Sequence, residues 1–422
     1  MKNSKQFSQR LFVRAPGLRR QTSRAFVRFL SAFVAFTFIF SMSAQGALAA
    51  DSNSMALLPV SNNMELFPNS SIVDKDRFMR ESHGFLVEEL DGRVIEEQNP
   101  DTAYNPASAV KVLTAYATLK HFGPDFEFET KVLIDGSTVG NLFEGDIYLQ
   151  GRDPFFNTAS LQQVFAAFKS QGVNTVEASL FVSSDFGFAG SARGQKAASA
   201  LKRLFGGAKK KRARTLRTAG VRVNLKNAQV KAAPAQATVL TQVKSPNILA
   251  LLKDMLSRSD NQMAETFGQE VGGPQAVARI CRADFSLSSD ALTIATTSGL
   301  GVNRVSPKAM IAALRGFKKL LAGYKLNLSD ALPIAGIDQG TIYKRFAQSE
   351  LKDVLVGKTG TLKQTDKGAS VLVGEISTLL RGHVLFVVFQ RGRNTYQLRQ
   401  SQNLFLEHLL SDSGGPGLKY SG

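Results

Sequence analysis

The chain has 422 residues, enough for more than one domain, and with 43% hydrophobic and 20% charged residues it is too apolar to be disordered. A single cysteine, Cys281, excludes an intramolecular disulfide and cysteine-rich zinc sites, and four scattered histidines argue against a histidine-based metal site. The net charge of +18 is typical of nucleic-acid-binding proteins, but the positions of the charges along the chain point elsewhere.

The first fifty residues have the order of a secretory signal. Residues 1–28 hold eight Lys and Arg residues and no acid, and a mostly apolar run of 14 residues follows from Phe29 to Met42. This run is shorter than the roughly 20 residues that a membrane-spanning helix needs. We therefore predict cleavage near Ala49, a polar linker over residues 50–74, and an exported protein of the periplasm or cell envelope that meets no nucleic acid.

The next segment predicts a β-hairpin and then a buried helix. Two strand-like runs, residues 84–90 and 93–97, flank Asp91-Gly92, a pair that suits a tight turn. Residues 107–120 are nearly all apolar, which in a helix means burial on almost every side. Gly123-Pro124 then ends the helix.

Residues 131–244 read as an inserted α/β module with a basic arm. Strand-like runs alternate with one amphipathic helix, residues 160–171, as far as Phe188, and the sequence then becomes rich in Gly, Ala and Lys without clear elements. Residues 186–253 hold fifteen Lys and Arg residues and no acid. Its densest part, from Lys209 to Arg217, is typical of a solvated loop and is also a candidate tether to an anionic wall or membrane surface.

Helical periodicity returns near Ser245 and gives way to strands beyond Leu351. We predict three helices, over residues 248–256, 263–271 and 307–321. Short turns then join strands that suit antiparallel pairing, over residues 354–356, 369–376 and 383–390. A last helix, residues 396–410, precedes a Gly-rich tail that we expect to be flexible over residues 411–422.

Ser108 and Lys111 are the first candidates for chemistry. Residues three apart share one face of a helix, so the hydroxyl and the amine can meet. An unperturbed lysine is neutral in only about one molecule in 2,500 at pH 7, a cost of roughly 4.6 kcal/mol. Burial and a neighbouring cation lower the pKa and make the amine a base for the serine proton.

The Ser-x-x-Lys pattern alone is weak, because Ser199 with Lys202 and Ser349 with Lys352 match it too. Two further patterns follow in the chain: Ser259-Asp260-Asn261, which also suits a helix N-cap, and Lys358-Thr359-Gly360, which also suits an exposed turn. Ser199 lies in the Gly/Ala/Lys-rich stretch, and Ser349 leaves nine residues before Lys358. Only Ser108 begins an apolar helix that would bury its lysine.

With these three patterns in this order, the chain resembles the penicillin-binding D-alanyl-D-alanine carboxypeptidases of the low-molecular-mass, class C (peptidase S13) type. The resemblance implies an α/β (α+β) fold of the β-lactamase/DD-peptidase kind: an antiparallel sheet flanked by helices, a helical subdomain and here a reduced inserted α/β domain. It assigns residues 75–130 and 245–410 to the peptidase domain. Supporting stretches include Asn105-Pro106-Ala107, Thr297-Ser298-Gly299-Leu300 and Leu332-Pro333-Ile334.

The resemblance further implies acyl transfer on the stem peptides of peptidoglycan, with β-lactams as covalent inhibitors and no metal or other cofactor. Ser108 would be the nucleophile, Lys111 its base and Ser259 a proton relay to the leaving amine. The substrate would be bound by five residues: Asn261, Lys358, Thr359, Gly360 and Thr361. Among them, Lys358 and Thr359 would hold the terminal carboxylate, and Asn261 would contact the amide on the acyl side. The backbone N–H groups of Ser108 and Thr361 would form the oxyanion hole.

The chain departs from the family pattern in three places. The second insert is shortened or replaced by the basic stretch, the usual Gly-Asp-Pro reads Gly151-Arg152-Asp153-Pro154, and Thr296 or Thr297 replaces an acid before Ser-Gly-Leu. These departures leave open whether terminal D-alanine removal or cross-link cleavage dominates.

Two other functions stay open on the residues. A serine β-lactamase shares the three patterns but needs a glutamate to direct water. None of the three candidates, Glu265, Glu270 and Glu350, lies in the Glu-x-x-Leu-Asn setting of such enzymes. A wall-binding scaffold with a decayed site would explain the shortened insert and the basic stretch, but not the presence of every catalytic residue type.

Overall fold

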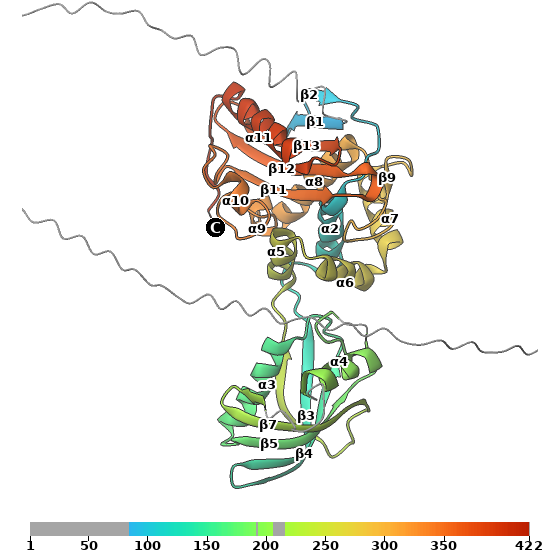
Figure 1. The fold of residues 1–422 in the computed structure, drawn as a ribbon, viewed down its shortest axis with the longest axis vertical. Coiled ribbons are helices and arrows are strands. Elements are labelled where there is room, and N and C mark those ends of the chain that lie inside the picture. Colours follow the sequence, from blue (N-terminus) through green and yellow to red (C-terminus); the bar gives the residue numbers. More distant parts are fainter. Residues whose placement is uncertain (1–83, 191–192, 206–215, 422) are drawn as a thin grey trace, which may run out of the picture. The chain divides into compact units, whose positions relative to one another are not determined.

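The computed structural model describes residues 84–190, 193–205 and 216–421 (Figure 1). The predicted signal, its cleavage point and the linker lie outside the described residues, as does the basic stretch from Lys209 to Thr215. In the part of the chain that is described, no helix is both long enough and apolar enough to cross a membrane.

A five-stranded antiparallel sheet in the order β11-β12-β13-β1-β2 carries the peptidase-like part. The hairpin and the three late strands predicted from sequence are its members: β1 Gly84–Glu89, β2 Val94–Gln98, β11 Leu355–Leu362, β12 Ala369–Thr378 and β13 Gly382–Arg391. All ten residues of β12 are buried, because helices cover both faces of the sheet (Figure 1).

The two faces of this sheet belong to two hydrophobic cores. Side chains alternate along a strand, so Val371 and Val373 enter the core that contains α2, while Leu372 enters the core on the side of α11 (Thr395–Asp412). Burial on both faces explains why these strands read as continuous apolar runs rather than as an alternating pattern.

A helical group surrounds the predicted buried helix. That helix is a 3-10 turn, η1 (Ala107–Ala109), followed by α2 (Val110–Phe122), and all residues of α2 from Val110 to Leu119 are buried. Its neighbours are four helices: α5 Ile248–Arg258, α6 Asn261–Val271, α7 Pro274–Phe285 and α8 Pro307–Gly323. Sequence periodicity predicted three of these helices and missed α7.

The shorter elements lie between these helices and strands. They comprise β9 Leu292–Thr293 paired with β10 Arg304–Val305, the single-turn helices α9 Leu328–Ala331 and α10 Tyr343–Phe346, and the 3-10 turn η2 Thr365–Lys367.

A second, mixed sheet, in the order β6-β7-β5-β4-β3-β8, runs from Glu129 to Lys244 and has its own core. Its elements are β3 Glu129–Val139, β4 Leu142–Gly151, α3 Thr158–Ser170, β5 Thr175–Val182, α4 Gln195–Phe205, β6 Leu216–Thr218, β7 Val221–Val230 and β8 Thr238–Lys244. Regular elements therefore continue beyond Phe188, where the sequence becomes rich in Gly, Ala and Lys. Val221 and Val223 alternate with polar residues and are buried beside β5, a strand pattern that the surrounding Lys and Ala residues obscured.

The end of the chain, which the sequence predicts as a flexible tail, is bonded to the first sheet. The N–H of Gly417 donates to the carbonyl of Ser377 at 3.0 Å, and the Tyr420 hydroxyl donates to the Glu375 carboxylate at 2.6 Å. Glu375 is 1% exposed, and a buried carboxylate needs such partners.

The fold class predicted from sequence is confirmed, with antiparallel and mixed sheets flanked by helices.

Candidate active site

Ser108 and Lys111 meet at the start of α2. Ser108 lies in the 3-10 turn that precedes the α-helix rather than within the α-helix itself, and Lys111 follows in the first turn of α2. The Lys111 Nζ atom is 3.0 Å from the Ser108 Oγ atom. It also donates to Asn261 Oδ1 at 2.7 Å and to the carbonyl oxygen of Ser298. The lysine is completely buried, as its position in the apolar helix predicted.

Burial lowers the pKa of Lys111 to about 8, although the negative charges of Asp260 and Glu265 act in the opposite direction. At pH 7 the amine is then neutral in about one molecule in 11, and reaching the neutral form costs roughly 1.4 kcal/mol instead of roughly 4.6. The structure thus makes Lys111 a usable base at a pH where an exposed lysine would stay charged.

The two competing Ser-x-x-Lys matches form no such pair. Ser199, on α4, donates its hydroxyl to the carbonyl of Gln195 at 2.8 Å, and Lys202 is exposed. Ser349 donates to Glu407 at 2.7 Å, and Lys352 is likewise exposed. Neither lysine is buried beside its serine, as Lys111 is.

The turn that carries Ser108 is held in an unusual backbone conformation. Ala107 has a φ of 47°, a region that costs an alanine free energy. Buried Asn105 supports it from both ends of its amide, accepting from the N–H of Ala107 at 3.1 Å and donating to the carbonyl of Gly301 at 2.9 Å. Gly299, at φ 90°, packs so closely that a Cβ atom there would lie 2.1 Å from the Ala107 carbonyl oxygen.

Ser259, Asp260 and Asn261 join α5 to α6 and divide their roles. The N-cap of α6 is Asp260, whose side chain accepts from the N–H of Met263 at 2.9 Å. Ser259 ends α5 in the left-handed conformation, with φ 60°, and Asn261 begins α6 and bonds to Lys111. The capping role therefore falls on the aspartate alone, which leaves Ser259 and Asn261 facing the site.

β11 is an edge strand of the first sheet and carries Lys358, Thr359, Gly360 and Thr361. Lys358 is fully buried and donates to the carbonyl of Thr359 at 2.9 Å; its pKa is held well below its usual value by burial and by the nearby charge of Lys111. A Cβ atom on Gly360 would lie 2.6 Å from the Pro106 carbonyl oxygen. The missing side chain thus lets β11 pack against the serine turn.

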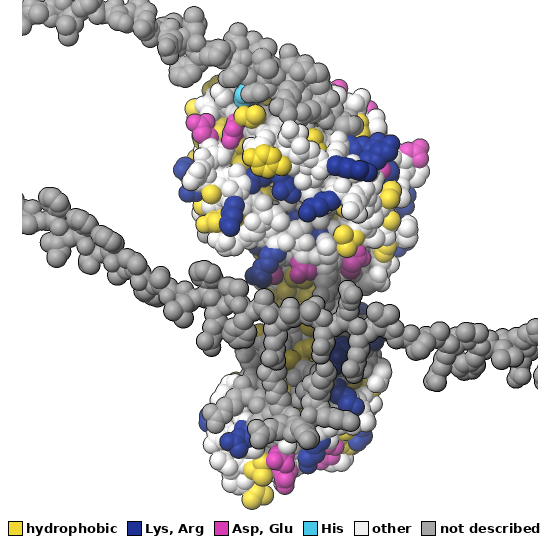
Figure 2. All heavy atoms as spheres, in the orientation of Figure 1, with side chains coloured by type: hydrophobic (Ala, Val, Ile, Leu, Met, Phe, Trp, Pro, Cys, Tyr) yellow, Lys and Arg dark blue, Asp and Glu magenta, His cyan; other side chains and the backbone are white. Residues whose placement is uncertain are grey.

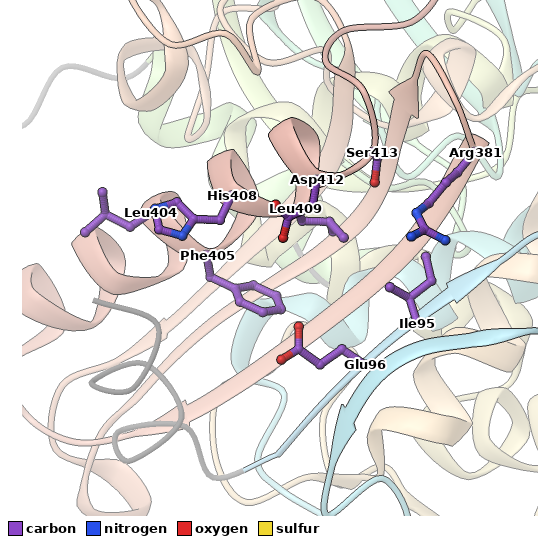
Figure 3. A pocket seen from close by; sticks show the side chains of 9 residues that line it. All are labelled: Ile95, Glu96, Arg381, Leu404, Phe405, His408, Leu409, Asp412 and Ser413. Atoms are coloured by element: carbon purple, nitrogen blue, oxygen red, sulfur yellow. The ribbon is translucent and has the colours of Figure 1, made fainter. Parts of the chain in front are cut away.

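One cleft of about 700 Å³ brings most of the predicted site residues together: Ser108, Ser259, Asn261, Thr359 and Thr361. The rest of its lining was not predicted. It comes from α10 (Lys344 and Arg345), from α11 (Tyr396, Arg399, Gln400 and Asn403) and from Thr341, two residues before α10. A separate pocket of about 280 Å³, between β2 and α11, contains none of the predicted residues (Figure 3).

Glu265 is a further residue whose role the sequence patterns did not reveal. Its carboxylate accepts from the N–H of Ser298 at 3.0 Å and from the Thr297 hydroxyl at 2.8 Å. Burial raises the pKa of this carboxyl, but these hydrogen bonds outweigh burial and hold the pKa below its usual value. Glu265 follows Asn261 by one helical turn, and this spacing is the signal that places both on one face.

Within the described ranges, no group of three or more His, Cys, Asp and Glu side chains is arranged to hold a metal ion. Cys281 is buried against α2, where its thiol contacts the carbonyl of Leu113 at 3.8 Å.

Comparisons with known proteins identify relatives of this chain. The chain is 32% identical over 200 residues to a D-alanyl-D-alanine carboxypeptidase of Haemophilus influenzae, which covers 44% of this chain and 40% of the relative. It is 30% identical over 170 residues to a carboxypeptidase of Mycobacterium tuberculosis, covering 36% of each. Each alignment thus spans about two fifths or less of the curated relative.

Two solved structures share the fold. A predatory endopeptidase of Bdellovibrio bacteriovorus superposes with a TM-score of 0.67 at 18% identity, covering 81% of this chain and 96% of the other. Penicillin-binding protein 4 of H. influenzae superposes with a TM-score of 0.57 at 21% identity, covering 79% and 98%. The model of the D-Ala-D-Ala carboxypeptidase 3 (S13) family matches residues 69–194 and 187–407, and the chain therefore belongs to this family.

Proposed function

We propose that this protein is a serine DD-peptidase that cleaves peptidoglycan stem peptides after a D-alanine, through an acyl-enzyme on Ser108. The buried contact between Lys111 Nζ and Ser108 Oγ is the observation that carries the proposal. Family membership supports the reaction class. Either the terminal D-alanine or the amine of a cross-linked diaminopimelate would be the leaving group.

In the acylation step, neutral Lys111 takes the proton of Ser108 while Oγ attacks the carbonyl carbon of the scissile amide. The negative charge on the carbonyl oxygen is stabilised by the backbone N–H groups of Ser108 and Thr361. Ser259 relays this proton from Lys111 to the departing nitrogen as the carbon–nitrogen bond breaks, which leaves Lys111 neutral again. Water then attacks the ester, releases the shortened peptide and returns the proton to Ser108.

The substrate would lie as an extended peptide along the edge of β11. Asn261 would contact the amide on the acyl side, and the hydroxyls of Thr359 and Thr361 would bind the terminal carboxylate. Lys358 supports this strand from inside the protein, and Gly360 allows the close approach that the oxyanion hole requires.

Turnover of a free pentapeptide ending in D-Ala-D-Ala tests the proposal. We expect mass spectrometry to show loss of one alanine with the wild type and none with Ser108→Ala. Ser199→Ala is the matched control and should retain activity. Loss of activity in the control, or turnover by Ser108→Ala, would contradict the assignment. Digestion of purified wall fragments then ranks terminal trimming against cross-link cleavage.

Two alternatives give different results in the same assays. A β-lactamase would release hydrolysed penicillin rapidly instead of accumulating the acyl-enzyme. Glu265, the glutamate on the helix of Asn261, is already bonded to the loop at Ser298, which disfavours a role in directing water. A decayed scaffold would bind wall fragments without cleaving them or reacting with penicillin.

We also propose the domain organisation and location predicted above: an exported protein with a peptidase domain over residues 75–130 and 245–410 and an inserted module over residues 131–244. The basic stretch from Lys209 to Arg217 would bind anionic wall polymer or lipid. Replacing Lys209, Lys210, Lys211, Arg212 and Arg214 by Gln leaves β6 untouched and should weaken salt-sensitive retention on isolated walls, with pentapeptide hydrolysis unchanged. Equal retention would refute the tether.

A further inference from the structure

The cleft beside Ser108 has one basic wall. Lys344, Arg345 and Arg399 line it, and none of the other lining residues is an acid. Among the described residues, none of these three cations lies within salt-bridge distance of a carboxylate. Three positive charges on one side of a peptide-binding cleft favour an anionic group on the substrate.

Arg399 is a cation of this wall that bonds to β11, the strand along which the substrate would lie. It projects from α11, is exposed, and its Nη2 atom donates to the Thr361 hydroxyl at 2.9 Å. Thr359, two residues earlier on the same strand, lines the same cleft and bonds to Thr341 at 2.7 Å. A guanidinium next to two threonine hydroxyls on a strand edge is a suitable arrangement for a planar carboxylate.

Lys358 is unsuited to a direct contact with this carboxylate. Its side chain is completely buried, its Nζ atom donates to the Thr359 carbonyl, and it is absent from the cleft lining. The positive charge that faces the cleft beside Thr361 therefore belongs to Arg399.

Arg345 holds Arg399 in place. Its Nε atom donates to Asn403 at 2.6 Å, and its Nη2 atom donates to Gln402 at 2.9 Å and to the backbone carbonyl of Arg399 at 3.1 Å. Gln402 is fully buried and in turn donates to the carbonyl of Ser370 on β12 at 3.0 Å. The start of α11 is thereby fixed to the sheet that carries Thr361.

We propose that Arg399 is a specificity-determining residue that binds the carboxylate on the carbon next to the scissile nitrogen, and that Arg345 is its positioning residue. The inference rests on the proposed peptidase function and identifies the group that the leaving amine must carry. A D-alanine or a diaminopimelate centre supplies this carboxylate, whereas an amidated terminus does not.

The test compares an N-acylated D-Ala-D-Ala peptide with the same peptide carrying a C-terminal amide. We expect Arg399→Gln to lower kcat/KM for the free acid about tenfold, as for one lost charge-assisted hydrogen bond, and to leave the amide unchanged. Arg399→Lys should recover part of the preference. Arg393→Gln, an exposed arginine outside the cleft lining, is the matched control.

Binding of both peptides to Ser108→Ala, with and without Arg399→Gln, separates this inference from the proposed function, because binding needs no turnover. An acid-to-amide affinity ratio that falls about tenfold supports the inference even if the wild type cleaves neither peptide. An unchanged ratio, or an equal loss for acid and amide, overturns it. Arg345→Gln should lower the same ratio, whereas a purely structural role would weaken both ligands alike.

Discussion

Removing the charge of Asp260 should make acylation faster at neutral pH. Burial lowers the pKa of Lys111 to about 8, and two carboxylates oppose this shift. Asp260 has the larger effect of the two, ahead of Glu265. Replacement by Asn keeps the N-cap, because an Asn side chain accepts the same hydrogen bond. Asp260→Asn therefore removes a negative charge near the amine with little change to α6, and the pKa of Lys111 should fall.

The size of the effect follows from the neutral fraction of Lys111. With a pKa of about 8, about one molecule in 11 is neutral at pH 7, so complete deprotonation would accelerate acylation at most about 11-fold. The wild-type rate should rise about 90-fold from pH 6 to pH 9 and be half-maximal near pH 8. In Asp260→Asn the midpoint should move to lower pH, with a rate gain at pH 7 below that limit.

The assay is the second-order rate of labelling by a fluorescent penicillin between pH 6 and pH 9.5. Asp254→Asn is the control, because Asp254 is a nearby acid on α5 that pairs with Arg258 and is not among the charges acting on Lys111. A wild-type rate that is flat from pH 6 to pH 9 would show that neutral Lys111 is not the base. An Asp260→Asn midpoint that stays in place or moves to higher pH would show that Asp260 does not raise the pKa of Lys111.

Two further substitutions test how the serine turn and the end of the chain are held. Gly299→Ala should slow acylation by roughly 100-fold, because the new Cβ atom displaces the serine turn. Gly301→Ala is the control: Gly301 also has a positive φ, but a Cβ atom there would lie 3.9 Å from its nearest neighbour, so acylation should slow only slightly. Equal losses in the two variants would contradict this role of Gly299. Tyr420→Phe removes a hydrogen bond to buried Glu375 and should lower the free energy of unfolding by about 1.5–3 kcal/mol with acylation unchanged. Urea denaturation measures it, and a stability equal to the wild type would show that the end of the chain is not held.

Local patterns in the sequence predicted the parts of the site that lie close together in the chain. The three-residue spacing of Ser108 and Lys111 placed amine and hydroxyl together, and the apolar helix around them predicted the burial that the structure shows. The same patterns missed that Ser108 precedes the α-helix. A 3-10 turn bonds residue i to i+3 instead of i+4, and a turn of three residues is too short to leave a periodicity of its own.

The sequence could not predict the basic wall of the cleft, because the residues that form it are distant in the chain. Arg345 and Arg399 are 54 residues apart and face one cleft only because α10 and α11 lie beside the same end of the sheet. No motif links them. Gly299 could not be recognised from the sequence either. A side chain is excluded there by the Ala107 carbonyl oxygen, and Ala107 lies far away in the sequence.

Ser108, activated by buried Lys111, is the residue that we expect to become acylated. Reaction of the purified protein with benzylpenicillin, followed by proteolysis and peptide mass spectrometry, locates the adduct directly. We expect one penicilloyl group, on the peptide that contains Ser108, and none in Ser108→Ala. An adduct on Ser199 or Ser349, or an unmodified protein at saturating penicillin, would contradict it.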